Sequence, residues 1–137
     1  MSYFHNTEIR VRYGETDRMG YLYYGNYAQY LEVARVETMR SLGISYKEME
    51  DSGIMLPVLE LNIKYIKPAY YDDVLIVRTE IRNMPTIRTT FYYEIFRNEN
   101  ETITIGNTTL VFFDILKKKP VKAPDYLTEK LQPFFNG

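Results

Sequence analysis

Several stretches of this chain alternate between hydrophobic and polar residues, which is the period of a half-buried β-strand. In the first stretch, residues 8–13, Ile9, Val11 and Tyr13 share one face. The other stretches cover residues 59–65, 75–82, 87–95 and 102–114. Because the segments between the later stretches are short and rich in turn-forming residues, the pattern predicts an antiparallel meander rather than parallel crossover units.

Residues 27–42 instead follow the 3.6-residue period of an amphipathic α-helix. Asn26 before this segment is a residue type that caps helix N-termini, and Gly43 after it is typical of a helix stop. At 1.5 Å per residue such a helix spans roughly 24 Å, which is enough to cross a sheet of several strands. The residues predicted to face the core are Tyr27, Tyr30, Leu31, Ala34, Thr38 and Leu42.

Local signals predict two shorter helices. Residues 45–51 begin with Ser45 and carry Glu48 three positions later, which is the pattern of a capping box. Residues 125–132 form a brief amphipathic segment near the C-terminus, and we expect Pro133 to end it.

These elements predict a single α+β domain over residues 1–137, in which one long helix lies on an antiparallel sheet of about five strands. We place its core at about residues 8–115 and a C-terminal tail at residues 116–137. One helix covers only one face of such a sheet and leaves strand edges open, whereas native edges are paired, covered or charged. A symmetric homodimer that joins two sheets would satisfy the edges, and it would place a pocket between the subunits.

The charge balance and the rare residue types exclude several classes of function. The chain carries 17 basic and 18 acidic side chains, a net charge of −1, and so lacks the electrostatic footprint of a general nucleic-acid or membrane-surface binder. The absence of cysteine excludes a disulfide scaffold, a thiol nucleophile and thiolate metal ligation. His5 is the single histidine, so no site can draw two imidazoles from one chain. Chemistry based on carboxylates remains.

No targeting signal is visible in the sequence. The N-terminal segment is charged between Glu8 and Arg18 and has no apolar signal-peptide core. No uncharged apolar run approaches the roughly 18 residues of a membrane span. We therefore expect a cytoplasmic location and no membrane span.

The segment 13–27 carries the main candidate chemistry. Asp17 lies in a glycine-punctuated loop between the first strand and the long helix. Backbone amides near residues 24–26 would lack intrahelical partners and would lie at the positive end of the helix dipole. Such amides can hold the oxygen of a carbonyl group while a carboxylate attacks its carbon or activates water. From the spacing alone, an ordinary turn role for Asp17 stays open as well.

The same segment resembles the signature of the 4-hydroxybenzoyl-CoA thioesterase-like family of hotdog-fold acyl-CoA thioesterases. The resemblance extends over about residues 8–115 and includes a second block at residues 65–69 and 72–75. The matching residues of the loop and helix are Tyr13, Glu15, Thr16, Asp17, Gly20, Tyr23, Tyr24, Asn26, Tyr27, Glu32, Ala34, Arg35, Glu37, Leu42 and Gly43.

The resemblance implies a hotdog fold and the release of a free carboxylic acid and coenzyme A, with neither metal nor redox cofactor. Asp17 falls on the family's catalytic aspartate, and the amide of Tyr24 falls on the position that polarises the thioester carbonyl. It further implies that Gly25 and Asn26 contact the substrate. Many members carry histidine where this chain has Tyr24, so only a backbone role is assigned to this residue.

Other roles remain open beside this interpretation. Arg88, and Thr90 two positions later, match places where the family directs basic or hydroxyl groups toward the coenzyme A phosphates, although an exposed strand arginine needs no ligand. A related hotdog group uses a glutamate of the long helix instead of the aspartate, and Glu32 and Glu37 lie on this helix. Both lie off the predicted core stripe, which favours a solvated or interface role for them. The acyl group could instead be carried by acyl carrier protein, or the chain could bind acyl-CoA without cleaving it. The assembly could be a homodimer or a homotetramer.

Overall fold

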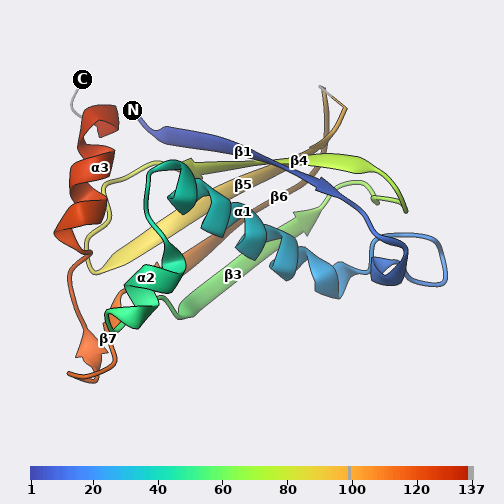
Figure 1. The fold of residues 1–137 in the computed structure, drawn as a ribbon. Coiled ribbons are helices and arrows are strands. Elements are labelled where there is room, and N and C mark those ends of the chain that lie inside the picture. Colours follow the sequence, from blue (N-terminus) through green and yellow to red (C-terminus); the bar gives the residue numbers. More distant parts are fainter. Residues whose placement is uncertain (99, 136–137) are drawn as a thin grey trace.

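The computed structural model describes residues 1–98 and 100–135, and its centre is a five-stranded antiparallel sheet crossed by one long helix (Figure 1). The helix is α1 (Tyr27–Ser41). The strands, in the order in which they lie side by side, are β1 (Tyr3–Arg10), β4 (Val74–Ile81), β5 (Arg88–Arg97), β6 (Glu101–Val111) and β3 (Val58–Tyr65). The predicted α+β class and the long helix on an antiparallel sheet are therefore confirmed.

Small elements gather at the two ends of this layer. At one end lie α2, β7 and α3, and at the other the chain between β1 and α1 forms a loop (Figure 1). The bounds are η1 (Tyr13–Glu15), η2 (Tyr24–Asn26), α2 (Tyr46–Asp51), β2 (Ile54–Met55), β7 (Phe113–Asp114), β8 (Lys119–Pro120) and α3 (Asp125–Phe135). The first two are 3₁₀ turns, and β2, β7 and β8 pair as a separate small sheet.

The order of the strands differs from the predicted meander. Strands β4, β5 and β6 follow one another as expected, but β3 pairs with β6 instead of β4 and forms an edge of the sheet. The first strand runs from Tyr3 to Arg10 rather than over residues 8–13, because the chain turns into η1 at Tyr13. The last long strand ends at Val111, short of the predicted residue 114.

Of four predictions about helix ends, the structure confirms two and contradicts two. The Ser45 hydroxyl accepts a hydrogen bond from the Glu48 amide at 3.2 Å, and Gly43 has a φ of +82° after α1. Asn26 precedes α1 but does not cap it, because its side-chain amide donates to the Glu15 carbonyl at 2.9 Å. Pro133 lies inside α3, which continues to Phe135, because a proline this close to a helix C-terminus interrupts only its last turn.

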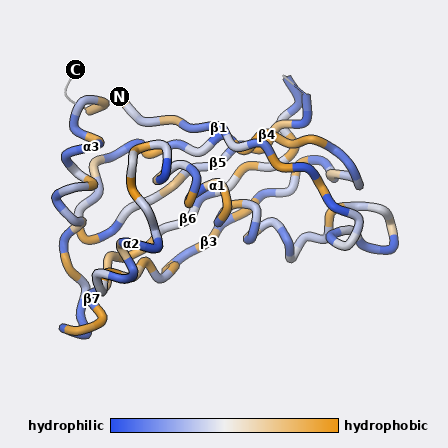
Figure 2. The backbone as a smooth tube through the Cα atoms, in the orientation of Figure 1, coloured by the Kyte–Doolittle hydropathy of each residue, from blue (hydrophilic) through white to orange (hydrophobic). Residues whose placement is uncertain are grey.

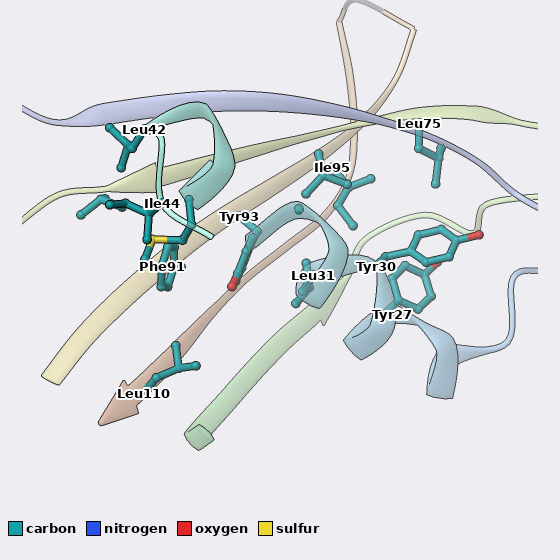
Figure 3. Packing of buried hydrophobic residues seen from close by; sticks show 14 of the residues in the cluster. Tyr27, Tyr30, Leu31, Leu42, Ile44, Leu75, Phe91, Tyr93, Ile95 and Leu110 are labelled. Carbon is teal, nitrogen blue, oxygen red and sulfur yellow. The ribbon is translucent and has the colours of Figure 1, made fainter. Parts of the chain in front are cut away.

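The core lies between α1 and the inner face of the sheet. Phe91, Tyr93 and Ile95 alternate along β5 and are directed toward the same region as Leu31 of α1 (Figure 3). All six residues of the predicted helix stripe are buried. In Figure 2 hydrophobic and hydrophilic segments alternate over short distances along the chain, as this two-layer packing requires.

The inner face of β3 is the exception to this burial. α1 lies closer to β1 and β4 than to β3, so it covers only part of the edge strand, where Tyr27 packs against Tyr65. Leu59, Leu61 and Tyr65 are 51%, 42% and 48% exposed. An edge strand with an apolar face open to solvent is the kind of surface that proteins normally cover or pair.

Candidate active site

Glu15 holds together the loop that carries the candidate chemistry. Its carboxylate accepts hydrogen bonds from the Arg12 amide at 2.9 Å and from the Tyr30 hydroxyl at 2.6 Å, and it forms an ion pair with the Arg12 guanidinium at 3.1 Å. Its carbonyl oxygen accepts from the amide of Tyr23 and the side chain of Asn26. Burial acts to raise the pKa of Glu15, but the bonds from Tyr30 and Arg12 outweigh it and keep this pKa below its ordinary value. Glu15 thereby joins the loop to α1.

Asp17 lies at the tip of this loop and is exposed. Its amide donates to the Tyr21 carbonyl at 2.8 Å, and its Oδ1 accepts from the amides of Met19 at 2.9 Å and Tyr21 at 3.2 Å. Its other oxygen, Oδ2, accepts no hydrogen bond from the described residues. The carboxylate is thus oriented through one oxygen, and the second is left without a hydrogen bond within the described part of the chain.

The start of α1 offers two backbone donors. In the described part of the chain, the amides of Tyr24 and Gly25 have no hydrogen-bond acceptor, as expected for the first residues of a helical turn. They lie at the positive end of the helix dipole. A Cβ at Gly25 would stand 2.5 Å from the ring of Tyr23, so glycine allows that ring to pack over the turn.

Aromatic rings surround this helix start. The Tyr24 ring is 65% exposed and lies 4.8 Å from the ring of Tyr23. The Tyr65 hydroxyl donates to the Tyr24 carbonyl at 3.4 Å, and its ring packs edge-on against that of Tyr27 at 4.9 Å. Burial raises the pKa of Tyr27 above its ordinary value, so this phenol stays protonated at neutral pH. The surface beside the unpaired amides is therefore apolar in its rings and able to donate hydrogen bonds at its hydroxyls.

Asp17 and Tyr24 share one loop of the chain, between β1 and α1. The segment between them folds back, with a bridge between Thr16 and Leu22. A cavity of about 550 Å³ lies on the outer face of the sheet, away from α1, and neither Asp17 nor Tyr24 lines it.

Arg88 and Thr90 lie apart from the loop in the single chain. Both are on the outer face of β5, where Arg88 pairs with Val111 and the Thr90 hydroxyl is 3.0 Å from that of Thr109. The helix start is near the opposite end of the sheet, where Tyr65 pairs with Thr104. One chain therefore brings Asp17, Tyr24, Gly25 and Asn26 into one region but not the two residues expected at the coenzyme A phosphates.

Arg35 is a buried cation that the core prediction did not include. It is 6% exposed, and its guanidinium donates to the hydroxyls of Tyr46 and Tyr93, each at 3.1 Å. Burial raises the pKa of Tyr46 to about 12, which keeps this hydroxyl neutral. The position of Arg35, four residues after Leu31 on the buried side of the helix, is the signal that could have predicted its burial.

Residues 1–98 and 100–135 contain neither a cluster of potential metal ligands nor a helix that could span a membrane. No three histidine or carboxylate side chains gather there in a way that could hold a metal ion. None of the helices in this part combines the length and the apolar character that crossing a membrane would require.

A long helix laid across an antiparallel sheet in the order β1-β4-β5-β6-β3 is the architecture of the hotdog class of domains. The sequence profile of the Thioesterase-like superfamily matches residues 11–131. The chain therefore belongs to this superfamily and is by class a thioester hydrolase.

Individual relatives agree with this assignment. A solved structure of DHNA-CoA thioesterase from Staphylococcus aureus is 38% identical, has a TM-score of 0.88, and its match covers 97% of this chain and 93% of that one. Acyl-CoA thioester hydrolase YbgC of Escherichia coli O157:H7 is 31% identical over 116 residues, which are 85% of this chain and 87% of YbgC. The chloroplastic acyl-acyl carrier protein thioesterase ATL3 of Arabidopsis thaliana is 33% identical over 98% of this chain and 70% of its own length.

Proposed function

We propose that this chain hydrolyses acyl-CoA thioesters to a free carboxylic acid and coenzyme A, with Asp17 as the catalytic carboxylate. The observation that carries the proposal is the pairing, on one loop, of an oriented carboxylate with a free oxygen and two backbone amides without acceptors. The names of the relatives YbgC and DHNA-CoA thioesterase support an acyl-CoA substrate. The name DHNA-CoA thioesterase also makes an aryl acyl group one candidate for the acyl part of the substrate.

The chemistry follows from these groups. The amides of Tyr24 and Gly25 hold the carbonyl oxygen as it gains negative charge. Asp17 either attacks the carbonyl carbon, forming an anhydride that water then cleaves, or removes a proton from the attacking water. In both routes the C–S bond breaks, the thiolate of coenzyme A leaves and takes up a proton, and the acid is released. The proposal assigns Tyr24 a role through its backbone amide and gives its ring no step in the reaction.

A second copy of the chain completes the site in this proposal. Asp17 of one subunit faces the helix start of its partner, and the exposed apolar face of β3 lies at the contact. The exposure of Leu59, Leu61 and Tyr65 supports such a contact, since these side chains are apolar and lie on an edge strand. Arg88 and Thr90 then reach coenzyme A only from a neighbouring subunit. The cytoplasmic location and the choice between dimer and tetramer stay predictions.

The substitution Asp17→Asn tests the catalytic role. Asparagine keeps an oxygen that can accept from the amides of Met19 and Tyr21, so the loop is expected to fold normally. It removes the nucleophile or base, and kcat should fall by about 10²- to 10⁴-fold. Release of free thiol from a panel of aryl and alkyl acyl-CoAs measures the rate, and thermal melting checks the fold. Activity within a few-fold of the wild type would exclude Asp17 from the chemistry.

The same panel of substrates distinguishes two alternative functions from the proposed one. The relationship to ATL3 favours acyl carrier protein as a second acyl donor, and comparing one acyl group on both carriers decides between them. Tyr24 in the place of the family's histidine favours a protein that binds acyl-CoA without cleaving it. Tight binding of acyl-CoA with no thiol release for any acyl group would establish this binder and exclude the hydrolase.

A further inference from the structure

Arg97, at the end of β5, donates hydrogen bonds to both ends of the turn of residues 68–73. The proposed mechanism gives this turn no catalytic role. Nη1 of Arg97 donates to the Pro68 carbonyl at 2.9 Å and to Asp73 Oδ2 at 3.0 Å. Its Nε and Nη2 donate to the two carboxylate oxygens of Glu101 at 2.9 and 3.2 Å. The side chain is 18% exposed, and the guanidinium lies 5.6 Å from the centre of the Tyr70 ring. One planar cation thus ties the turn of residues 68–73 to the hairpin of β5 and β6.

The same turn also contacts the loop that contains Asp17. The Ala69 carbonyl accepts a hydrogen bond from the Leu22 amide at 2.7 Å, and Ala69 is completely buried. Tyr21 forms a backbone bridge with Tyr70, and their rings lie 5.3 Å apart. The loop is therefore bound to the turn through two successive residues, Tyr21 and Leu22.

Of these two residues, Tyr21 contacts the candidate carboxylate Asp17 directly. Tyr21 donates its amide to Asp17 Oδ1 and accepts the amide of Asp17 on its carbonyl. The contacts form a continuous series from the guanidinium of Arg97 to the turn, from the turn to residues 21 and 22, and from there to Asp17.

The geometry requires arginine rather than any cation. The four acceptor atoms belong to Pro68, Asp73 and Glu101 and lie in different directions around one guanidinium plane. A lysine has a single nitrogen at the end of a flexible chain and cannot meet the bidentate Glu101 and the turn at the same time. Lys67 already pairs with Glu101 at 3.2 Å, so positive charge alone is also present without Arg97.

We propose that Arg97 is a positioning residue for Asp17: by fixing the turn of residues 68–73, it sets where the loop of residues 17–22 holds the carboxylate. This inference rests on the proposed hydrolase function of Asp17. It extends that function because Arg97 does not touch the reacting atoms and acts only through the turn.

The variants Arg97→Lys and Arg97→Gln test this role by kinetics. A carboxylate displaced by even about 1 Å slows the reaction without weakening binding, so kcat should fall about 10- to 100-fold while KM changes only a few-fold. Lysine is expected to restore little of the loss. The matched control is Arg82→Gln, directly after the neighbouring strand β4, which removes an ion pair with Glu80 and a cation–π contact with Tyr92 at the opposite end of β4 from the turn. It should leave kcat unchanged.

A second readout does not depend on activity. Hydrogen exchange of the Leu22 amide reports the bond to Ala69, and it should accelerate in Arg97→Gln but not in Arg82→Gln. Unchanged Leu22 exchange in Arg97→Gln overturns the inference, and so does a kcat equal to that of the wild type or one restored fully by lysine. If Asp17→Asn keeps its activity, the proposed function fails instead, while the exchange measurement still decides whether Arg97 fixes the loop.

Discussion

In the proposed mechanism, the amides of Tyr24 and Gly25 and the carboxylate of Asp17 serve different parts of one reaction. The amides precede the first intrahelical bonds of α1, so the fold itself leaves them without acceptors. One oxygen of the carboxylate binds the loop, and the proposal assigns the chemistry to the other. Neither feature depends on a histidine, so the proposed mechanism is compatible with Tyr24 at that position.

Tyr24→Pro should remove the proposed oxyanion donor, together with the Tyr24 ring that lies beside Tyr23. The Tyr24 amide makes no hydrogen bond in the described structure, and Tyr23 before it has a ψ of 131°, an extended conformation that a following proline favours. Because one such donor is worth about 10²- to 10³-fold in rate, kcat should fall by this factor. The control Tyr24→Phe keeps the amide and should stay within a few-fold of the wild type. Equal losses in both variants would assign the role to the phenol instead of the backbone.

Residue roles could be predicted from the sequence where they depend on neighbours along the chain. The loop position of Asp17 and the free amides at the start of α1 follow from local spacing. Asn26 was assigned wrongly as a cap, because the competing acceptor, the Glu15 carbonyl, reaches it only after the loop has folded. Arg97 could not be recognised at all, since two of its partners, Pro68 and Asp73, belong to a distant turn.

At the scale of elements, alternation predicted each strand of the main sheet but not its neighbours. A period of two assigns residues to faces, and several strand orders satisfy the same faces. The pairing of β3 with β6 is therefore a property of the whole sheet. It brings the end of β3 close to the hairpin of β5 and β6, where Lys67 and Arg97 both pair with Glu101.

This hairpin should show a distinct dependence on pH. Hydrogen bonds from Arg97 and Lys67 lower the pKa of Glu101 from 4.5 to about 2. A carboxylate whose pKa is lower in the folded state stabilises the protein above its unfolded pKa, and it loses this contribution as the pH falls toward the folded value. The free energy of unfolding should therefore be higher for the wild type than for Glu101→Gln above pH 4.5, and the difference should shrink toward pH 2.

Urea unfolding at a series of pH values measures this difference. Glu129→Gln on α3 is the control, because Glu129 is exposed and forms no ion pair among the described residues. Its difference from the wild type should remain small throughout. A difference between wild type and Glu101→Gln that does not vary between pH 2 and 4.5 would show that the charge of Glu101 does not stabilise the hairpin.

At the scale of the whole molecule, a single chain carries the groups of the proposed active site but does not enclose them. Asp17 and Tyr24 are exposed, and the apolar face of β3 beside the helix start is open. A partner placed by a two-fold axis would cover this face and bring the loop of each subunit to the helix start of the other. This arrangement predicts that the two halves of a site can be supplied by different chains.

Heterodimers carrying Asp17→Asn in one subunit and Tyr24→Pro in the other test this arrangement. Such a dimer, co-expressed with two tags and purified by both, contains one intact site if the sites are shared, so its turnover should be about half that of the wild type. Each variant alone as a homodimer should be nearly inactive. The reciprocal control pairs a wild-type subunit with a subunit that carries both changes. Shared sites are then both broken and this dimer is inactive, whereas sites built within one chain would reverse the two results, and a monomer in solution would exclude sharing altogether.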